Sequence, residues 1–91
     1  MIERSVEVVN RLGLHARAAA QLVRTACCFS SALQLERLDK SAAADAKSIL
    51  SVLMLAAARG SVLRVTADGA DEHEALNALC QLFTEKFGES E

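Results

Sequence analysis

Asn10-Arg-Leu-Gly-Leu-His-Ala-Arg-Ala-Ala-Ala20 is the stretch in which the chain changes from a strand-like to a helical sequence. Before it, polar and apolar side chains alternate from Glu3 to Val8, a period of two that indicates a half-buried strand. After Gly13, which permits a sharp change of direction, apolar residues recur at helical spacing. We therefore expect a first strand that ends near Asn10 and a helix from Ala16 to about Cys28.

His15 lies at this junction, with Arg17 two residues later. Imidazole has an unperturbed pKa of about 6.5, so a good fraction of it is neutral and nucleophilic at neutral pH. The start of a helix offers free backbone N–H groups, here those of Ala16, Arg17 and Ala18, and these attract anions. The guanidinium of Arg17 adds a permanently charged fork for phosphate oxygens. The stretch predicts a site where His15 can hold a phosphoryl group. No carboxylate lies nearby in the sequence that could activate a water molecule to hydrolyse this phosphoryl group.

The remaining elements follow from the same two periodicities. We expect strands at 33–36, 41–44 and 61–67, a turn at 38–40, and helices at 46–58 and from Asp71 to Gly88. The order β-α-β-β-α-β-α predicts an α+β fold, with the helices on one face of a single, mainly antiparallel sheet.

The second helix is nearly apolar all round, which leaves two interpretations of its faces. Either the stripe Ile49, Leu50, Leu53 and Met54 stays exposed as a partner surface, or Ile49, Val52, Leu53 and Ala56 pack inward. The pattern alone does not separate them.

Composition excludes several classes of protein. A chain of 91 residues with 52% hydrophobic content suits one domain, 1–91. Its net charge of −2 and three aromatic residues argue against a nucleic-acid partner. No signal peptide or membrane span is visible, so we expect a cytoplasmic protein without direct membrane insertion. We expect Cys27, Cys28 and Cys80 to be reduced thiols, two of them packed in helices, and we expect neither a metal site nor a cofactor.

Three stretches together resemble the HPr family, the histidine-containing phosphocarrier proteins of the bacterial phosphoenolpyruvate-dependent sugar phosphotransferase system (PTS). They are Asn10-x-x-Gly13-Leu14-His15-Ala16-Arg17, Ala46-Lys47-Ser48-Ile49 and Gly69-Ala70-Asp71-Glu72. The resemblance implies an open-faced β-sandwich of four antiparallel strands with three helices on one side. It also implies that His15 accepts a phosphoryl group on Nδ1 from enzyme I and passes it to an enzyme IIA domain.

The resemblance further implies a docking surface made of Arg17, Ala20, Ile49, Leu50 and Leu53. Ser48 has two interpretations: it or Asp45 caps the second helix, or it is the serine that a dedicated HPr kinase phosphorylates in many bacteria. The chain departs from the family pattern at three positions. Ala18 replaces the usual proline, and Ser51 and Ala56 stand where many relatives carry glycine, which predicts a more regular second helix.

Two alternatives to sugar transport stay open. The chain could be a regulatory paralogue for nitrogen or carbon control, acting through Ser48, or a structural interaction module whose histidine is idle. His73 is expected on the solvated face of the third helix. We expect a monomer, because a carrier must separate readily from transient partners.

Overall fold

Four strands form one antiparallel sheet in the computed structural model, which describes residues 1–90. The strands are β1 (Ile2–Glu7), β2 (Ala32–Arg37), β3 (Ala42–Asp45) and β4 (Val62–Asp68). They lie in the order β1-β4-β2-β3, so the central pair is made of strands from the two halves of the chain. Leu35 is opposite Val65 in this pair, and both side chains are fully buried.

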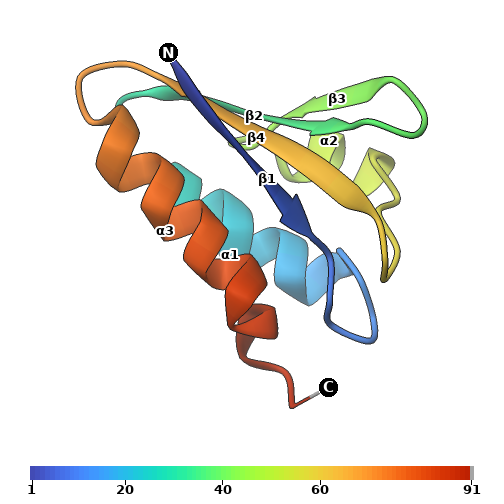
Figure 1. Ribbon diagram of the computed structural model, residues 1–91. Helices are drawn as coiled ribbons and strands as arrows, with labels where there is room; N and C mark the ends of the chain where they lie inside the picture. The colour runs from blue at the N-terminus through green and yellow to red at the C-terminus, as the bar shows by residue number, and fades with distance from the viewer. Residues whose placement is uncertain (91) are drawn as a thin grey trace.

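The helices are α1 (Ala16–Ala26), α2 (Ile49–Met54) and α3 (Glu72–Thr84), followed by a short 3₁₀ turn η1 (Lys86–Gly88). Figure 1 shows α1 and α3 packed side by side against one face of the sheet, with α2 beside α1 and close to β3. The predicted fold is confirmed: a four-stranded antiparallel sheet carries three helices on one side, and its other face is open.

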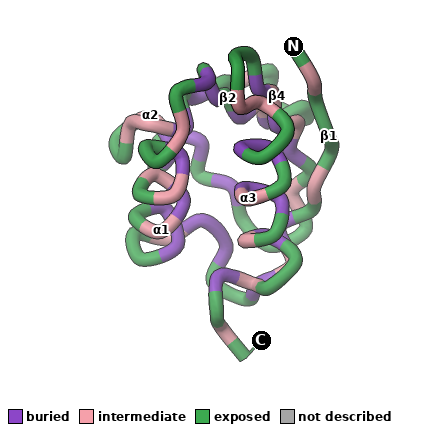
Figure 2. Tube along the Cα trace, turned by 90° about the vertical axis from the view of Figure 1, so that its left-hand side faces the viewer, coloured by how far each residue is buried: buried purple, intermediate pink, exposed green. Residues whose placement is uncertain are grey.

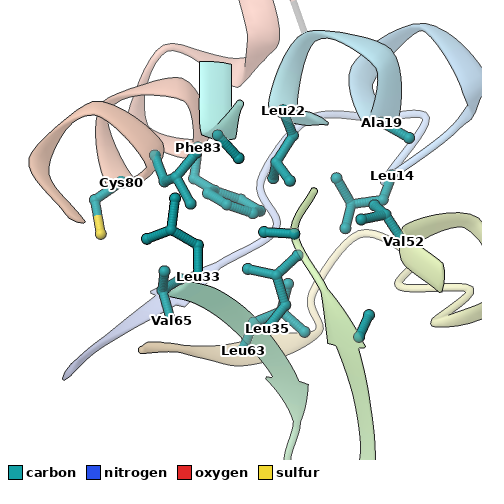
Figure 3. Packing of buried hydrophobic residues seen from close by; sticks show 14 of the residues in the cluster. Leu14, Ala19, Leu22, Leu33, Leu35, Val52, Leu63, Val65, Cys80 and Phe83 are labelled. Carbon is teal, nitrogen blue, oxygen red and sulfur yellow. The ribbon is translucent and has the colours of Figure 1, made fainter. Parts of the chain in front are cut away.

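The hydrophobic core lies between the sheet and the helices. The strands contribute Leu33, Leu35, Leu63 and Val65, and Figure 3 shows them facing Leu22, Val52 and Phe83 from the three helices. In Figure 2 the buried parts of the chain gather in the interior, while α2 is largely exposed or intermediate. Burial of these side chains is the main stabilising term of the fold.

The predicted second helix is wrong in length. Residues 46–48 are not helical, because the Ala46 N–H still bonds to the Leu33 carbonyl across to β2 (2.9 Å) and Ser48 is the N-cap. At the other end Ala56 turns into the left-handed region (φ +50°) and stops the helix after Met54. The expectation that Ala56 makes this helix more regular is therefore wrong as well.

Smaller boundary errors have local causes. The first strand ends at Glu7 rather than near Asn10, although the Val8 N–H still donates to the Ser61 carbonyl (2.9 Å) before the chain turns. The third helix ends at Thr84, where the chain turns through left-handed conformations at Lys86 and Phe87.

The three cysteines are free thiols. Only Cys80 is buried, in α3, whereas Cys27 and Cys28 are exposed in the turn after α1, so the prediction of two packed thiols is wrong. No helix within residues 1–90 is long and apolar enough to cross a membrane.

Candidate phosphoryl-accepting site

The loop between β1 and α1 is held in place by its own sequence. Gly13 adopts φ +67°, and a Cβ atom at this position would lie 2.7 Å from the Ala57 carbonyl oxygen. The next residue, Leu14, donates its N–H to that same oxygen (2.9 Å) and is buried beside Val52 (Figure 3). Glycine is needed here because only it combines this backbone conformation with such close approach. The loop is thus fastened to the segment that follows α2.

His15 is the N-cap of α1, which begins at Ala16 as predicted. Its backbone is extended (ψ 177°), and its ring nitrogen Nδ1 accepts a hydrogen bond from the Arg17 N–H (3.2 Å). A nitrogen that accepts a backbone N–H carries a lone pair, so the ring proton belongs on Nε2. The structure therefore points the unprotonated nitrogen at the start of the helix, where the free N–H groups of the first turn attract an anion.

The residues at the start of α1 differ in exposure and therefore in how they can contribute to an anion site. Arg17 is exposed, and it lines a hollow with Arg11, Leu12, Gly88, Glu89 and Ser90. Ala18 is fully buried, so only its backbone can contribute to an anion site. Ala16 and Ala20 are exposed and one turn apart, which places them on the same face of α1.

A carboxylate that the sequence did not reveal lies against His15. Glu89 Oε2 is 2.5 Å from His15 Nε2, although 74 residues separate them. The absence of a nearby carboxylate in the sequence was therefore misleading. The hydrogen bond to His15 is the main reason that the pKa of Glu89 is lowered from its ordinary value, against the opposing effect of its own desolvation.

Asn10 hydrogen-bonds both to the loop that carries His15 and to the Glu89 carboxylate. Its side chain is buried, and Nδ2 donates to the Gly13 carbonyl (2.8 Å) and to the two Glu89 carboxylate oxygens (3.3 and 3.2 Å). In the sequence, Asn10 is only the first residue of the motif that carries His15. In the structure it also links the histidine loop to the C-terminal tail.

The second helix presents the apolar surface that one of the two interpretations predicted. Val52 and Leu55 pack into the core, whereas Ile49, Leu50, Leu53 and Met54 are exposed by 43, 65, 37 and 75%. The inward-facing alternative is wrong for Ile49, Leu53 and Ala56. The helix that carries these side chains, α2, is a neighbour of α1, which His15 caps (Figure 2).

Ser48 caps α2: its Oγ accepts the Ser51 N–H at 3.3 Å. Asp45 instead accepts the Lys47 N–H (2.9 Å), so of the two candidate caps Ser48 is the one used. His73 is exposed, as expected, and no group of three or more metal-ligating side chains occurs within residues 1–90.

Comparison with known proteins shows what the chain is similar to. The family model described as the PTS HPr component phosphorylation site matches residues 2–85. Phosphocarrier protein HPr of Xylella fastidiosa (strain Temecula1) is 48% identical over 89 residues, which are 98% of each chain. HPr of Neisseria meningitidis serogroup B is 44% identical over 91 residues and the full length of both chains. Phosphocarrier protein NPr of Escherichia coli K12 is 39% identical over 88 residues, 97% of each chain.

Solved structures give the same result. The crystal structure of HPr-C-His from Thermoanaerobacter tengcongensis superposes with a TM-score of 0.94 at 42% identity and covers 100% of both chains. A structure described as an HPr dimer from the same organism has a TM-score of 0.77 at 43% identity, covering 98% of this chain and 100% of the other.

Proposed function

Since the chain belongs to the HPr family of PTS phosphocarrier proteins, we propose that His15 is its phosphoacceptor. Nδ1 takes a phosphoryl group from phosphorylated enzyme I and passes it to an enzyme IIA domain for sugar uptake. The observation that carries this proposal is the hydrogen bond from the Arg17 N–H to Nδ1, which shows that Nδ1 is unprotonated and directs its lone pair at the N-terminus of α1. We further propose that the protein acts in the cytoplasm, as a monomer and without a cofactor or metal.

The first turn of α1 supplies the charge stabilisation that phosphoryl transfer requires. Transfer depends mainly on positioning and on neutralising the phosphoryl oxygens. In this proposal the backbone N–H groups of Ala16, Arg17 and Ala18 turn toward those oxygens, and the Arg17 guanidinium binds them from the solvent side. Ala18 keeps an N–H that proline would lack, so the chain has one more donor there than the usual family sequence.

The exposed apolar side chains fit a docking surface for enzyme I and enzyme IIA. Ala20, Ile49, Leu50 and Leu53 form it together with Arg17 in this proposal. Exposed apolar surface of this kind, beside a charged reactive group, is typical of transient protein partners.

A regulatory function is the second candidate, favoured by the 39% identity with NPr and by the position of Ser48. A phosphate on Ser48, added by an HPr kinase, would bring a charge of about −1.5 to −2 beside the apolar surface and would weaken docking there. Transfer assays distinguish the two functions. A sugar-transport carrier passes its phosphate to sugar-specific acceptors, whereas a regulatory paralogue passes it to a regulatory acceptor only.

The decisive experiment is phosphorylation by phosphoenolpyruvate and enzyme I, followed by intact-protein mass spectrometry. We expect one acid-labile phosphoryl group on the wild-type protein and none on His15→Ala. The matched control is His73→Ala, which removes the other histidine and should be phosphorylated normally. Labelling of His15→Ala, or no labelling of the wild-type protein, would contradict the proposal.

A further inference from the structure

We propose that Glu89 is a positioning residue for His15, fixing the orientation and tautomer of the imidazole so that Nδ1 stays unprotonated and its lone pair can pass from the Arg17 N–H to the phosphoryl group. The inference rests on the proposed function of His15 and extends it to a residue at the other end of the chain. Its direct evidence is the contact between Glu89 Oε2 and His15 Nε2 (2.5 Å). The two side chains are only 14 and 26% exposed.

The Glu89 carboxylate is also held from a second side, by Asn10. Asn10 Nδ2 donates to both carboxylate oxygens, and the Asn10 side chain is 1% exposed. The same amide group donates to the Gly13 carbonyl, so one buried side chain ties the tail to the loop that carries His15. A carboxylate with a hydrogen-bond donor on two sides has little freedom to leave the ring.

The backbone of the tail is also anchored to bring Glu89 to this place. Phe87 is 1% exposed and packs edge-to-face on Phe83, with ring centroids 5.0 Å apart. Lys86 and Phe87 have φ of +56° and +54°, an uncommon conformation for residues with large side chains. The Glu89 N–H then closes the turn on the Lys86 carbonyl (3.0 Å). Such local strain persists where the surrounding packing enforces it, and it is concentrated at functional sites.

The chemistry assigns a clear task to the carboxylate. With Nε2–H donating to Glu89, Nδ1 holds a lone pair that forms the bond to phosphorus, while the bond from phosphorus to the donor breaks and its electron pair stays with the donor. The Nε2 proton does not move, and the positive charge that develops on the ring is balanced by the ionised Glu89. In the return step the Nδ1–phosphorus bond breaks and its electron pair returns to Nδ1. Glu89 acts through the ring and lies on the side away from the transferred group.

The test uses Glu89→Gln and Glu89→Ala, with Glu85→Gln as the matched control, because Glu85 is an exposed glutamate four residues earlier whose carboxylate bonds to Gln81 instead. The first readout is the tautomer of His15, from ¹⁵N NMR of the ring nitrogens in the unphosphorylated protein, and it needs no partner. We expect the Nε2–H form to predominate in the wild-type protein and in Glu85→Gln. Glu89→Ala, which removes the acceptor, should show a substantial Nδ1–H population, and Glu89→Gln, whose amide oxygen can still accept from Nε2–H, should show a smaller one.

The second readout is the rate of phosphoryl transfer from enzyme I. Loss of a charge-assisted hydrogen bond to the reacting ring should slow transfer about tenfold or more in Glu89→Ala, with an unchanged thermal unfolding midpoint for the isosteric Glu89→Gln. Unchanged tautomer populations in both Glu89 variants would overturn the inference, as would transfer at the wild-type rate. If the wild-type protein accepts no phosphoryl group at all, the proposed function fails, while the tautomer measurement still decides whether Glu89 positions the ring.

Discussion

Ala56 shows how a single backbone angle shapes the surface beside His15. It follows Leu55, the C-cap of α2, and its φ of +50° lies in the left-handed region that favours glycine. A residue with a Cβ atom pays roughly 1–2 kcal/mol for this conformation. Ala56 therefore stands in a turn whose backbone conformation suits glycine better than alanine.

Ala56→Gly should therefore stabilise the protein by about 0.5–1 kcal/mol. Relief of the left-handed strain exceeds the entropy that glycine adds to the unfolded chain, which is about 0.4–1 kcal/mol. Urea denaturation measures the difference. The control is Ala58→Gly, an exposed neighbour without positive φ, which should lower the free energy of unfolding. Equal effects of the two substitutions would show that the backbone angle of Ala56 carries no strain.

At the scale of the element, α2 is too short to be stable by itself, since isolated helices of fewer than about 12 residues are marginal in water. Arg37 of β2 supports its C-terminal end. The guanidinium Nη1 donates to the carbonyls of Leu55 (3.1 Å) and Ala56 (2.8 Å). Asp39 pairs with Nε of the same guanidinium (2.9 Å), and this contact is the main reason that the pKa of Asp39 is lowered. The helix that carries the exposed apolar side chains thus depends on a buried arginine that binds the carbonyls at its C-terminal end.

Arg37→Met should destabilise the protein by about 1–3 kcal/mol, because two carbonyl groups lose their donors while the apolar volume is kept. Thermal or urea unfolding gives the magnitude. The matched control, Arg59→Met, replaces an exposed arginine close to the same turn and should change stability by less than about 0.5 kcal/mol. A loss of the same size in both variants would show that charge alone, rather than support of α2, is responsible.

At the scale of the molecule, the sequence predicts those features that depend on residues close together in the chain. Alternation and helical spacing give the order of elements, and the Gly13 to Arg17 motif gives the site because its residues are neighbours in the chain. The end of α2 could not be predicted, since apolar, helix-forming residues continue to Ala58 and only Arg37 and the Ala56 turn stop the helix. Glu89 was missed for the same reason: its contact with His15 depends on how the sheet and Phe87 fold the tail back.

Another long-range contact joins the start of α3 to the loop between α1 and β2. The Asp71 carboxylate accepts the N–H groups of Ser30 (2.9 Å) and Ser31 (3.0 Å) and a short bond from the Ser31 hydroxyl. The pKa of Asp71 is lowered from 3.8 to about 2, first because of the Ser31 hydroxyl and then because of the Ser30 N–H. The ionised form is therefore the one that holds these segments together.

The stability of the whole molecule should depend on the ionisation of Asp71. The pKa of Asp71 is lower in the folded than in the unfolded chain, so its contribution is complete above pH 4 and is lost as the pH falls toward 2. Asp71→Asn should be less stable than the wild-type protein at neutral pH, and the gap should close between pH 4 and 2. Ser31→Ala, which keeps both backbone donors, should show a smaller gap. Urea midpoints measured from pH 7 to 2 test this, and a gap that stays constant with pH would contradict it.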